Sequence, residues 1–122
     1  MSKINNQGIK TILYPVKDVA QAKALYIKLL GVEPESDTPY YVGFKLGEQQ
    51  IGLVPNGQAQ GMTGTTAHYH VDDIKTSLQL ILDAGGQVQQ DVRDVGAGRQ
   101  VAIAKDADGN IIGLIQDPKN SA

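Results

Sequence analysis

The chain has 122 residues, of which 41% are hydrophobic, and it contains no cysteine. This length suits one domain or two small modules fused together, and the lack of cysteine excludes disulfides, thiolate zinc sites and cysteine nucleophiles. A net charge of -2 gives no support for nucleic-acid binding. The sequence has neither an apolar signal region nor the roughly 20 apolar residues of a membrane span, so we expect a cytoplasmic protein without membrane partners.

The first half of the chain predicts a strand, a capped helix and two further strands. Residues 9–16 alternate and are rich in β-branched and aromatic side chains, as in a strand. Asp18 is placed as the N-cap of a helix that ends at Gly31. The stripe that we expect this helix to bury consists of Ala22, Leu25, Tyr26, Leu29 and Leu30. Residues 40–46 and 50–54 read as the two strands that follow.

The second half repeats this order after a glycine-rich linker at residues 55–65. A strand at 65–71 precedes a helix that begins at Asp72 or Asp73 and ends at Ala84. Its expected buried stripe is Ile74, Leu78, Ile81 and Leu82. The remaining expected elements are a strand from Val88, a loop at 96–98, a strand at 100–105, a turn at 106–110 and a strand at 111–116.

Matching positions in the two halves are 55 residues apart. The pairs are Thr11 with Thr66, Tyr14 with Tyr69, Val16 with Val71, Asp18 with Asp73 and Gly31 with Gly86. The pattern predicts an α+β fold of two βαβββ modules, residues 1–58 and 59–122, in which a mixed β-sheet forms a cup and the helices cover its outer face. Because concave surfaces bind small molecules, the expected partner is a small-molecule ligand.

Several short motifs in this order resemble those of one known family. They are Val16-Lys17-Asp18, Leu25-Tyr26, Leu29-Leu30-Gly31, Val71-Asp72-Asp73, Ala84-Gly85-Gly86 and the turn Asp106-Ala107-Asp108-Gly109-Asn110. The chain thereby resembles the vicinal oxygen chelate superfamily, which includes glyoxalase I, bleomycin- and fosfomycin-resistance proteins and extradiol dioxygenases. The resemblance covers nearly the whole chain and implies a homodimer as the default assembly.

Metalloenzymes of that family share four ligand positions, which this sequence fills with other residues. The two positions on the first strand of each module, usually His or Gln, correspond to Thr11 and Thr66. The two on the last strand of each module, usually Glu, correspond to Gly52 and Gly113. Glycine has no side chain, and a threonine hydroxyl is a poor neutral ligand beside imidazole or carboxylate. We therefore expect no metal cofactor at the family's position.

His68 and His70 are the only histidines, and strand alternation places both on the face of Thr66. They could form half of a displaced site for a divalent metal, or His68 could act as a general base. The favoured interpretation is that both line a pocket and hydrogen-bond to ligand or water. Arg99 could bind an anionic ligand group, and the other expected ligand-binding residues are Thr11, Leu13, Tyr40, Gly52, Thr66 and Gly113.

Three functions remain open at this point. The first, which the empty ligand positions favour, is a metal-free small-molecule binding protein of the glyoxalase/bleomycin-resistance type. The second is a lyase, isomerase or dioxygenase-type enzyme that uses His68 or His70 as a base or in a displaced metal site. The third is a regulatory or structural dimer without a ligand. The carboxylates Asp18, Asp72 and Asp73 are expected to cap helices rather than to catalyse a reaction.

Overall fold

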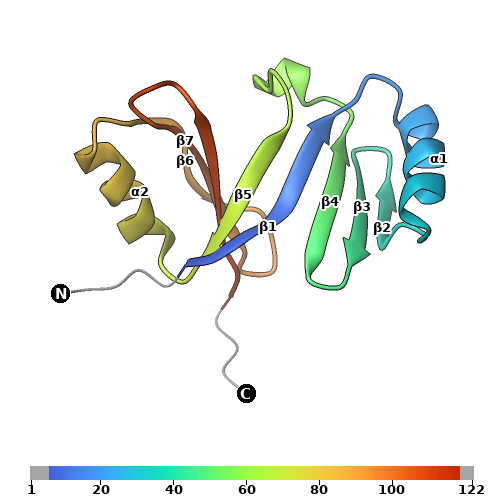
Figure 1. Cartoon of the computed structure of the whole chain (residues 1–122), viewed down its shortest axis with the longest axis horizontal. Coiled ribbons are helices and arrows are strands. Elements are labelled where there is room, and N and C mark those ends of the chain that lie inside the picture. The colour runs from blue at the N-terminus through green and yellow to red at the C-terminus, as the bar shows by residue number, and fades with distance from the viewer. Residues whose placement is uncertain (1–5, 119–122) are drawn as a thin grey trace. The chain divides into compact units, whose positions relative to one another are not determined.

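The computed structural model describes residues 6–118 and divides into two compact units. Within the described residues, the first unit is Lys10–Thr66, and the second joins residues 6–9 to residues 67–118. Each unit has the same construction, in which one helix packs on a β-sheet: α1 contacts β3 and β4, and α2 contacts β6, β7 and β8 (Figure 1). The predicted α+β fold of duplicated βαβββ modules is confirmed.

The strands of the first unit follow the order β2-β3-β4-β1. Their bounds are β1 Asn6–Pro15, β2 Ser36–Thr38, β3 Tyr41–Leu46 and β4 Gln49–Val54, and the part of β1 before Lys10 belongs to the second unit. β1 runs parallel to β4, whereas the β2–β3 and β3–β4 pairs are antiparallel. The helix α1, Val19–Leu30, follows β1 in the chain. It is part of the long connection that the parallel pair of β1 and β4 requires.

Both predicted caps of α1 are present. The Asp18 side chain accepts a hydrogen bond from the backbone N–H of Gln21 at 3.0 Å, which satisfies one of the first N–H groups of the helix. Gly31 ends the helix in the left-handed conformation, at φ 74°, and its N–H donates to the carbonyl of Ile27. Only a residue without a Cβ adopts this conformation at low cost, so the sequence signal and the geometry agree.

The buried stripe predicted for α1 is wrong in two positions. Leu25 and Leu29 are 57% and 68% exposed. The residues of α1 that pack on the core of Val42, Phe44 and Leu53 are Val19, Ala22, Tyr26, Ile27 and Leu30. The ring of Tyr26 lies between Tyr14 and Phe44, with centroids 5.5 and 6.5 Å away, and this contact sets the rotation of the helix. Successive helical residues are about 100° apart, so Leu25 then points away from the sheet.

The strands of the second unit follow the order β5-β8-β7-β6. Their bounds are β5 Thr66–Val71, β6 Gln87–Asp94, β7 Gln100–Lys105 and β8 Ile111–Gln116. β5 is parallel to β8, and β7 is antiparallel to both β8 and β6. The core beneath the helix α2, Ile74–Asp83, consists of Val71, Ile74, Leu78, Ala102, Ala104 and Leu114.

The structure selects between the two aspartates proposed to start α2. The Asp73 side chain accepts from the backbone N–H of Thr76 at 3.0 Å, so Asp73 is the N-cap. The turn before β8 is also held locally, because Asp106 accepts from the backbone N–H groups of Asp108 and Asn110. These aspartates therefore have structural roles, as the sequence predicted. Within residues 6–118, no helix is both long and apolar enough to cross a bilayer.

Two elements of the first unit differ from the sequence prediction. The sequence predicted only two strands after α1, but Ser36–Thr38 forms a further strand, β2, that pairs with β3. The next strand begins at Tyr41 rather than at Tyr40, because the Thr38 hydroxyl accepts from the backbone N–H groups of both tyrosines and holds them in a turn. Tyr40 is consequently 78% exposed, while the side chain of Tyr41 lies over the sheet.

Candidate functional site

The two histidines of β5 lie on the face of their sheet opposite α2. Tyr69 and Val71 pack into the core beneath α2, so strand alternation directs His68 and His70 to the other face. Both are buried, at 3% and 4% exposure. Thr66, on the same face at the start of β5, is also buried. These three side chains alternate with Ala67 and Tyr69 along β5.

The ring of His68 covers the last-strand position of the second unit. The parallel pairing of β5 with β8 aligns His68 with Gly113. A Cβ built on Gly113 would lie 2.6 Å from Cγ and Cδ2 of His68, much closer than the 3.5–4.0 Å that carbon atoms prefer. The imidazole ring of His68 therefore fills the space that a side chain at position 113 would need. Only glycine leaves room for the ring.

His70 is held by a carboxylate that the sequence reading did not identify. Its Nδ1 lies 3.1 Å from Oδ2 of Asp117, which directly follows β8. The other carboxylate oxygen, Oδ1, accepts from Nε of Arg99 at 2.6 Å. Arg99 follows the loop that begins at Gly96 and precedes β7, so three separate segments of the second unit meet at Asp117.

The ionisation of Asp117 determines which ring nitrogen of His70 carries its proton. Partial burial opposes ionisation of this carboxyl group, but hydrogen bonds and positive charge from Arg99, and then from His70, hold its pKa below the ordinary 3.8. At neutral pH Asp117 is thus a carboxylate, which can only accept hydrogen bonds. His70 must donate from Nδ1, and in the neutral ring Nε2 is then the accepting nitrogen.

The first unit has an aromatic ring at the equivalent last-strand position. Gly52 aligns with Leu13 of β1 and with Gly43 of β3. A Cβ built on Gly52 would lie 2.6 Å from Cδ2 of Leu13 and still closer to the hydroxyl of Tyr41. A Cβ on Gly43 would lie 2.8 Å from Cε2 of the same tyrosine. The Tyr41 ring therefore extends across both glycines, which allow it to lie flat on the sheet.

The remaining predicted residue of this face is Thr11, and it is buried. Its hydroxyl lies 3.4 Å from Oε1 of Gln50, its neighbour on β4. Tyr40, also predicted to bind ligand, is on the exposed turn before β3, and the tyrosine that covers the glycines is Tyr41. Strand alternation predicts which tyrosine lies on the sheet only when the first residue of the strand is known. The sequence did not show whether β3 begins at Tyr40 or at Tyr41.

A metal site needs several donor side chains close together. Among residues 6–118 no group of three or more His, Asp or Glu side chains is placed to hold a metal ion. At the positions where the family carries its ligands, the second unit offers Thr66 and Gly113, and the first offers Thr11 and Gly52. These residues do not fit a divalent cation, which prefers imidazole or carboxylate donors.

Comparison with known proteins agrees with this architecture. Residues 8–114 match the family model described as Glyoxalase/Bleomycin resistance protein/Dioxygenase superfamily. No curated protein sequence matches the chain. Similar solved structures include a hypothetical protein from Bacillus halodurans, with a TM-score of 0.74 and 18% identity over 97% of this chain and 99% of that one.

Two further structures of the same fold have described ligands. A methylmalonyl-CoA epimerase from Streptomyces coelicolor, in complex with 2-nitronate-propionyl-CoA, has a TM-score of 0.70 and 14% identity over 94% of this chain and 100% of that one. A Mn(II)-bound glyoxalase from Novosphingobium aromaticivorans has a TM-score of 0.69 and 18% identity over 98% of this chain and 44% of that one. At these identities the likeness establishes the fold, and the family match establishes the relationship. The chain belongs to the glyoxalase/bleomycin resistance protein/dioxygenase superfamily.

Proposed function

We propose that this protein binds a small organic molecule without the metal that the superfamily's metalloenzymes use. The observation that carries the proposal is the packing of His68 on Gly113. Replacing a ligand by glycine removes a donor, and the imidazole then fills the space next to that glycine. Adding a carboxylate at position 113 would therefore not restore the family's site unless His68 also moved.

The first unit supports the same proposal independently. Gly52 has no side chain at the equivalent position, and the Tyr41 ring lies over it. In each unit, a glycine beneath a ring thus stands where the family resemblance implies a metal-binding carboxylate. Aromatic side chains provide large, rigid contact area for organic ligands, which is the property that a binding protein needs in place of a metal.

The second unit, taken by itself, offers polar groups for ligand recognition. His70, Asp117 and Arg99 form a connected group that includes a buried imidazole with a fixed tautomer. A few fixed polar groups beside apolar walls are the usual means by which a pocket orients its ligand. The Streptomyces coelicolor epimerase, of the same fold, is in complex with a CoA ligand, which agrees with small-molecule binding by this architecture.

A second candidate function is acid–base catalysis by His70. The 3.1 Å contact with Asp117 favours it, because a carboxylate that accepts from Nδ1 orients an imidazole and raises the basicity of Nε2. The sequence favoured His68 for this role. Its ring is packed on Gly113, whereas His70 has a carboxylate partner that orients the imidazole, so we assign the role to His70 under this candidate.

Metal analysis of the purified protein tests the main proposal. We expect no stoichiometric Zn, Ni, Mn or Fe, and no increase of the unfolding midpoint when these ions are added. A ligand screen by thermal shift should instead find organic molecules that raise the midpoint, because a ligand that binds only the folded state stabilises it. A stoichiometric metal that is lost in His68→Ala and retained in the surface control Glu33→Gln would refute the proposal.

The assembly and the location of the protein remain predictions. We expect a homodimer, which sedimentation equilibrium would distinguish from a monomer of 13.0 kDa. We also expect a cytoplasmic protein, which fractionation of expressing cells would test. A turnover assay with any ligand from the thermal-shift screen separates binding from catalysis, since only catalysis consumes the ligand.

A further inference from the structure

A groove separates α2 from the edge strand β6 on the helix side of the second sheet. Its volume is about 510 Å³, within the range of small-molecule sites. β6 departs from regular pairing with β7 at two places, between Val88 and Gln90 and between Gln90 and Arg93. Such irregularities bend a strand locally. The histidines lie on the opposite face of this sheet, so the groove is a separate feature.

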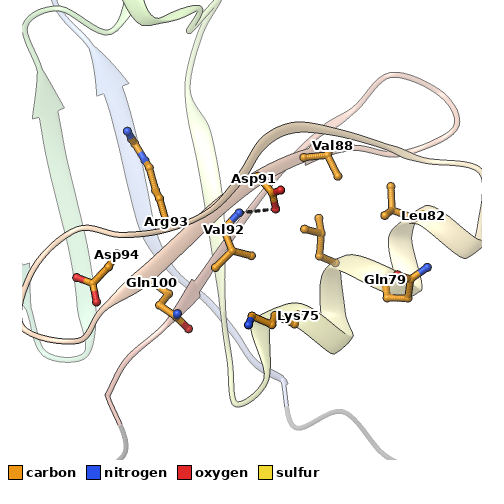
Figure 2. Close-up of a pocket in the computed structure, with 10 residues that line it drawn as sticks. Lys75, Gln79, Leu82, Val88, Asp91, Val92, Arg93, Asp94 and Gln100 are labelled. Atoms are coloured by element: carbon orange, nitrogen blue, oxygen red, sulfur yellow. Dashed lines mark hydrogen bonds between the residues drawn. The ribbon is translucent and has the colours of Figure 1, made fainter.

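The walls of the groove are apolar toward the end of α2. Leu82 lines it from the helix, and Val88 and Val92 line it from β6 (Figure 2). Leu78 of the helix also belongs to the lining. Val92 packs on the helix core, whereas Val88 is 39% exposed. A ligand that covers the exposed apolar side chains at the rim of this groove would be stabilised by about 25 cal/mol for each Å² of apolar surface removed from water. An aliphatic chain fits this part of the groove.

The polar end of the groove contains a cation. Lys75, in the first turn of α2, lines the groove together with Gln100 (Figure 2), and it forms no hydrogen bond or ion pair with any residue in the described range. The lining also contains a second cation, Arg93, and two carboxylates, Asp91 and Asp94, whose negative charges the two cations balance. Each of these carboxylates accepts a backbone hydrogen bond. Asp91 Oδ1 accepts from the N–H of Val92 at 2.8 Å, and Asp94 Oδ1 accepts from the N–H of Gly96 at 2.7 Å.

From this arrangement we infer that the groove binds a small aliphatic carboxylate. The ammonium of Lys75 and the amide of Gln100 would hold the carboxylate, and the aliphatic chain would cover Leu78, Leu82 and the two valines. Lysine is suited to this task because its three N–H donors rotate around a compact charge on a flexible stem. The inference is independent of the proposed function, which concerns the other face of the sheet.

Titration of isotope-labelled protein with hexanoate, followed by NMR, tests this inference. We expect hexanoate to shift the amide signals of Leu78, Val88 and Val92 saturably. Hexanol has the same chain without the charge, and hexylammonium reverses the charge. Because exposed ion pairs contribute up to about 1 kcal/mol, hexanoate should bind about threefold to fivefold more tightly than hexanol, and hexylammonium more weakly than both.

Two lysine variants decide whether the charge preference comes from the groove. Lys75→Met keeps the apolar stem and should abolish the preference of hexanoate over hexanol. Lys28→Met, the matched change on α1, should leave the preference intact. The inference fails if hexanol or hexylammonium binds as well as hexanoate, or if Lys75→Met retains the preference. It also fails if the same signals shift when the protein alone is concentrated and hexanoate has no effect, since a second copy would then occupy the groove.

Discussion

Substitution of Gly113 by alanine should destabilise the protein because of one neighbouring side chain. The new Cβ would lie 2.6 Å from two ring atoms of His68, so the ring must move by about 1 Å to reach normal contact. His68 is only 3% exposed, which leaves it little space. Overpacking of this kind costs about 1–3 kcal/mol, and the lower chain entropy of alanine offsets about 0.4–1 kcal/mol of it.

The expected net loss in the free energy of unfolding is therefore about 1–2 kcal/mol. Urea unfolding with linear extrapolation measures it as a lower midpoint at an unchanged slope. For a chain of this size the melting temperature should fall by about 5 °C. The matched control is Gly64→Ala, because a Cβ at Gly64 meets no heavy atom within 4 Å and the residue has no left-handed φ. Gly64→Ala should leave stability unchanged or raise it slightly.

A double-mutant cycle isolates the contact. In a His68→Ala background the ring is absent, so Gly113→Ala should no longer destabilise, and the coupling free energy should be about 1–2 kcal/mol. Two results would refute the reasoning. One is a Gly113→Ala variant as stable as Gly64→Ala, and the other is an equal loss with and without the ring. Either result would mean that the imidazole does not occupy the space beside Gly113.

Three further substitutions test individual contacts. Asp73→Ala should cost about 1 kcal/mol of unfolding free energy by removing the N-cap of α2, whereas Asp72→Ala should cost less than half of that in the same urea titration. The pKa of Asp117 lies below 3.8 in the folded state, so its contribution to folding stability is present above pH 3.8 and is lost as the pH falls through the folded pKa. The difference in unfolding free energy between wild type and Asp117→Asn should therefore narrow in acid. A difference that does not depend on pH would contradict this. Leu29→Ala should change the melting temperature by less than about 2 °C, while Leu30→Ala should lower it by at least about 5 °C, and equal effects would contradict the observed rotation of α1.

The duplicated fold could be predicted because its signals are local. Asp18 and Gly31 mark the ends of α1 by hydrogen bonds and backbone conformations that involve only residues a few positions away. The same holds for Asp73 and for the turn that begins at Asp106. The expectation that the family's metal ligands are absent also comes from single residues, since a glycine at position 113 has no side-chain donor in any conformation.

The parts that could not be predicted depend on contacts between distant segments. The rotation of α1 follows from the packing of Tyr26 between Tyr14 and Phe44, and a helix with leucines on two faces gives no sequence reason to choose one of them. The start of β3 follows from the Thr38 hydroxyl, and this one-residue shift exchanged Tyr40 for the next tyrosine on the sheet face.

The candidate site also has one part that the sequence predicts and another that only the folded structure shows. By itself the sequence determined that His68 and His70 share a face, because alternation along a strand is a property of the backbone. Only the tertiary structure decided their different environments. His68 packs on Gly113 because β5 and β8 pair in one register, and His70 meets Asp117 because the end of β8 returns to β5. Both contacts join residues more than 40 positions apart, and only the folded chain brings such residues together.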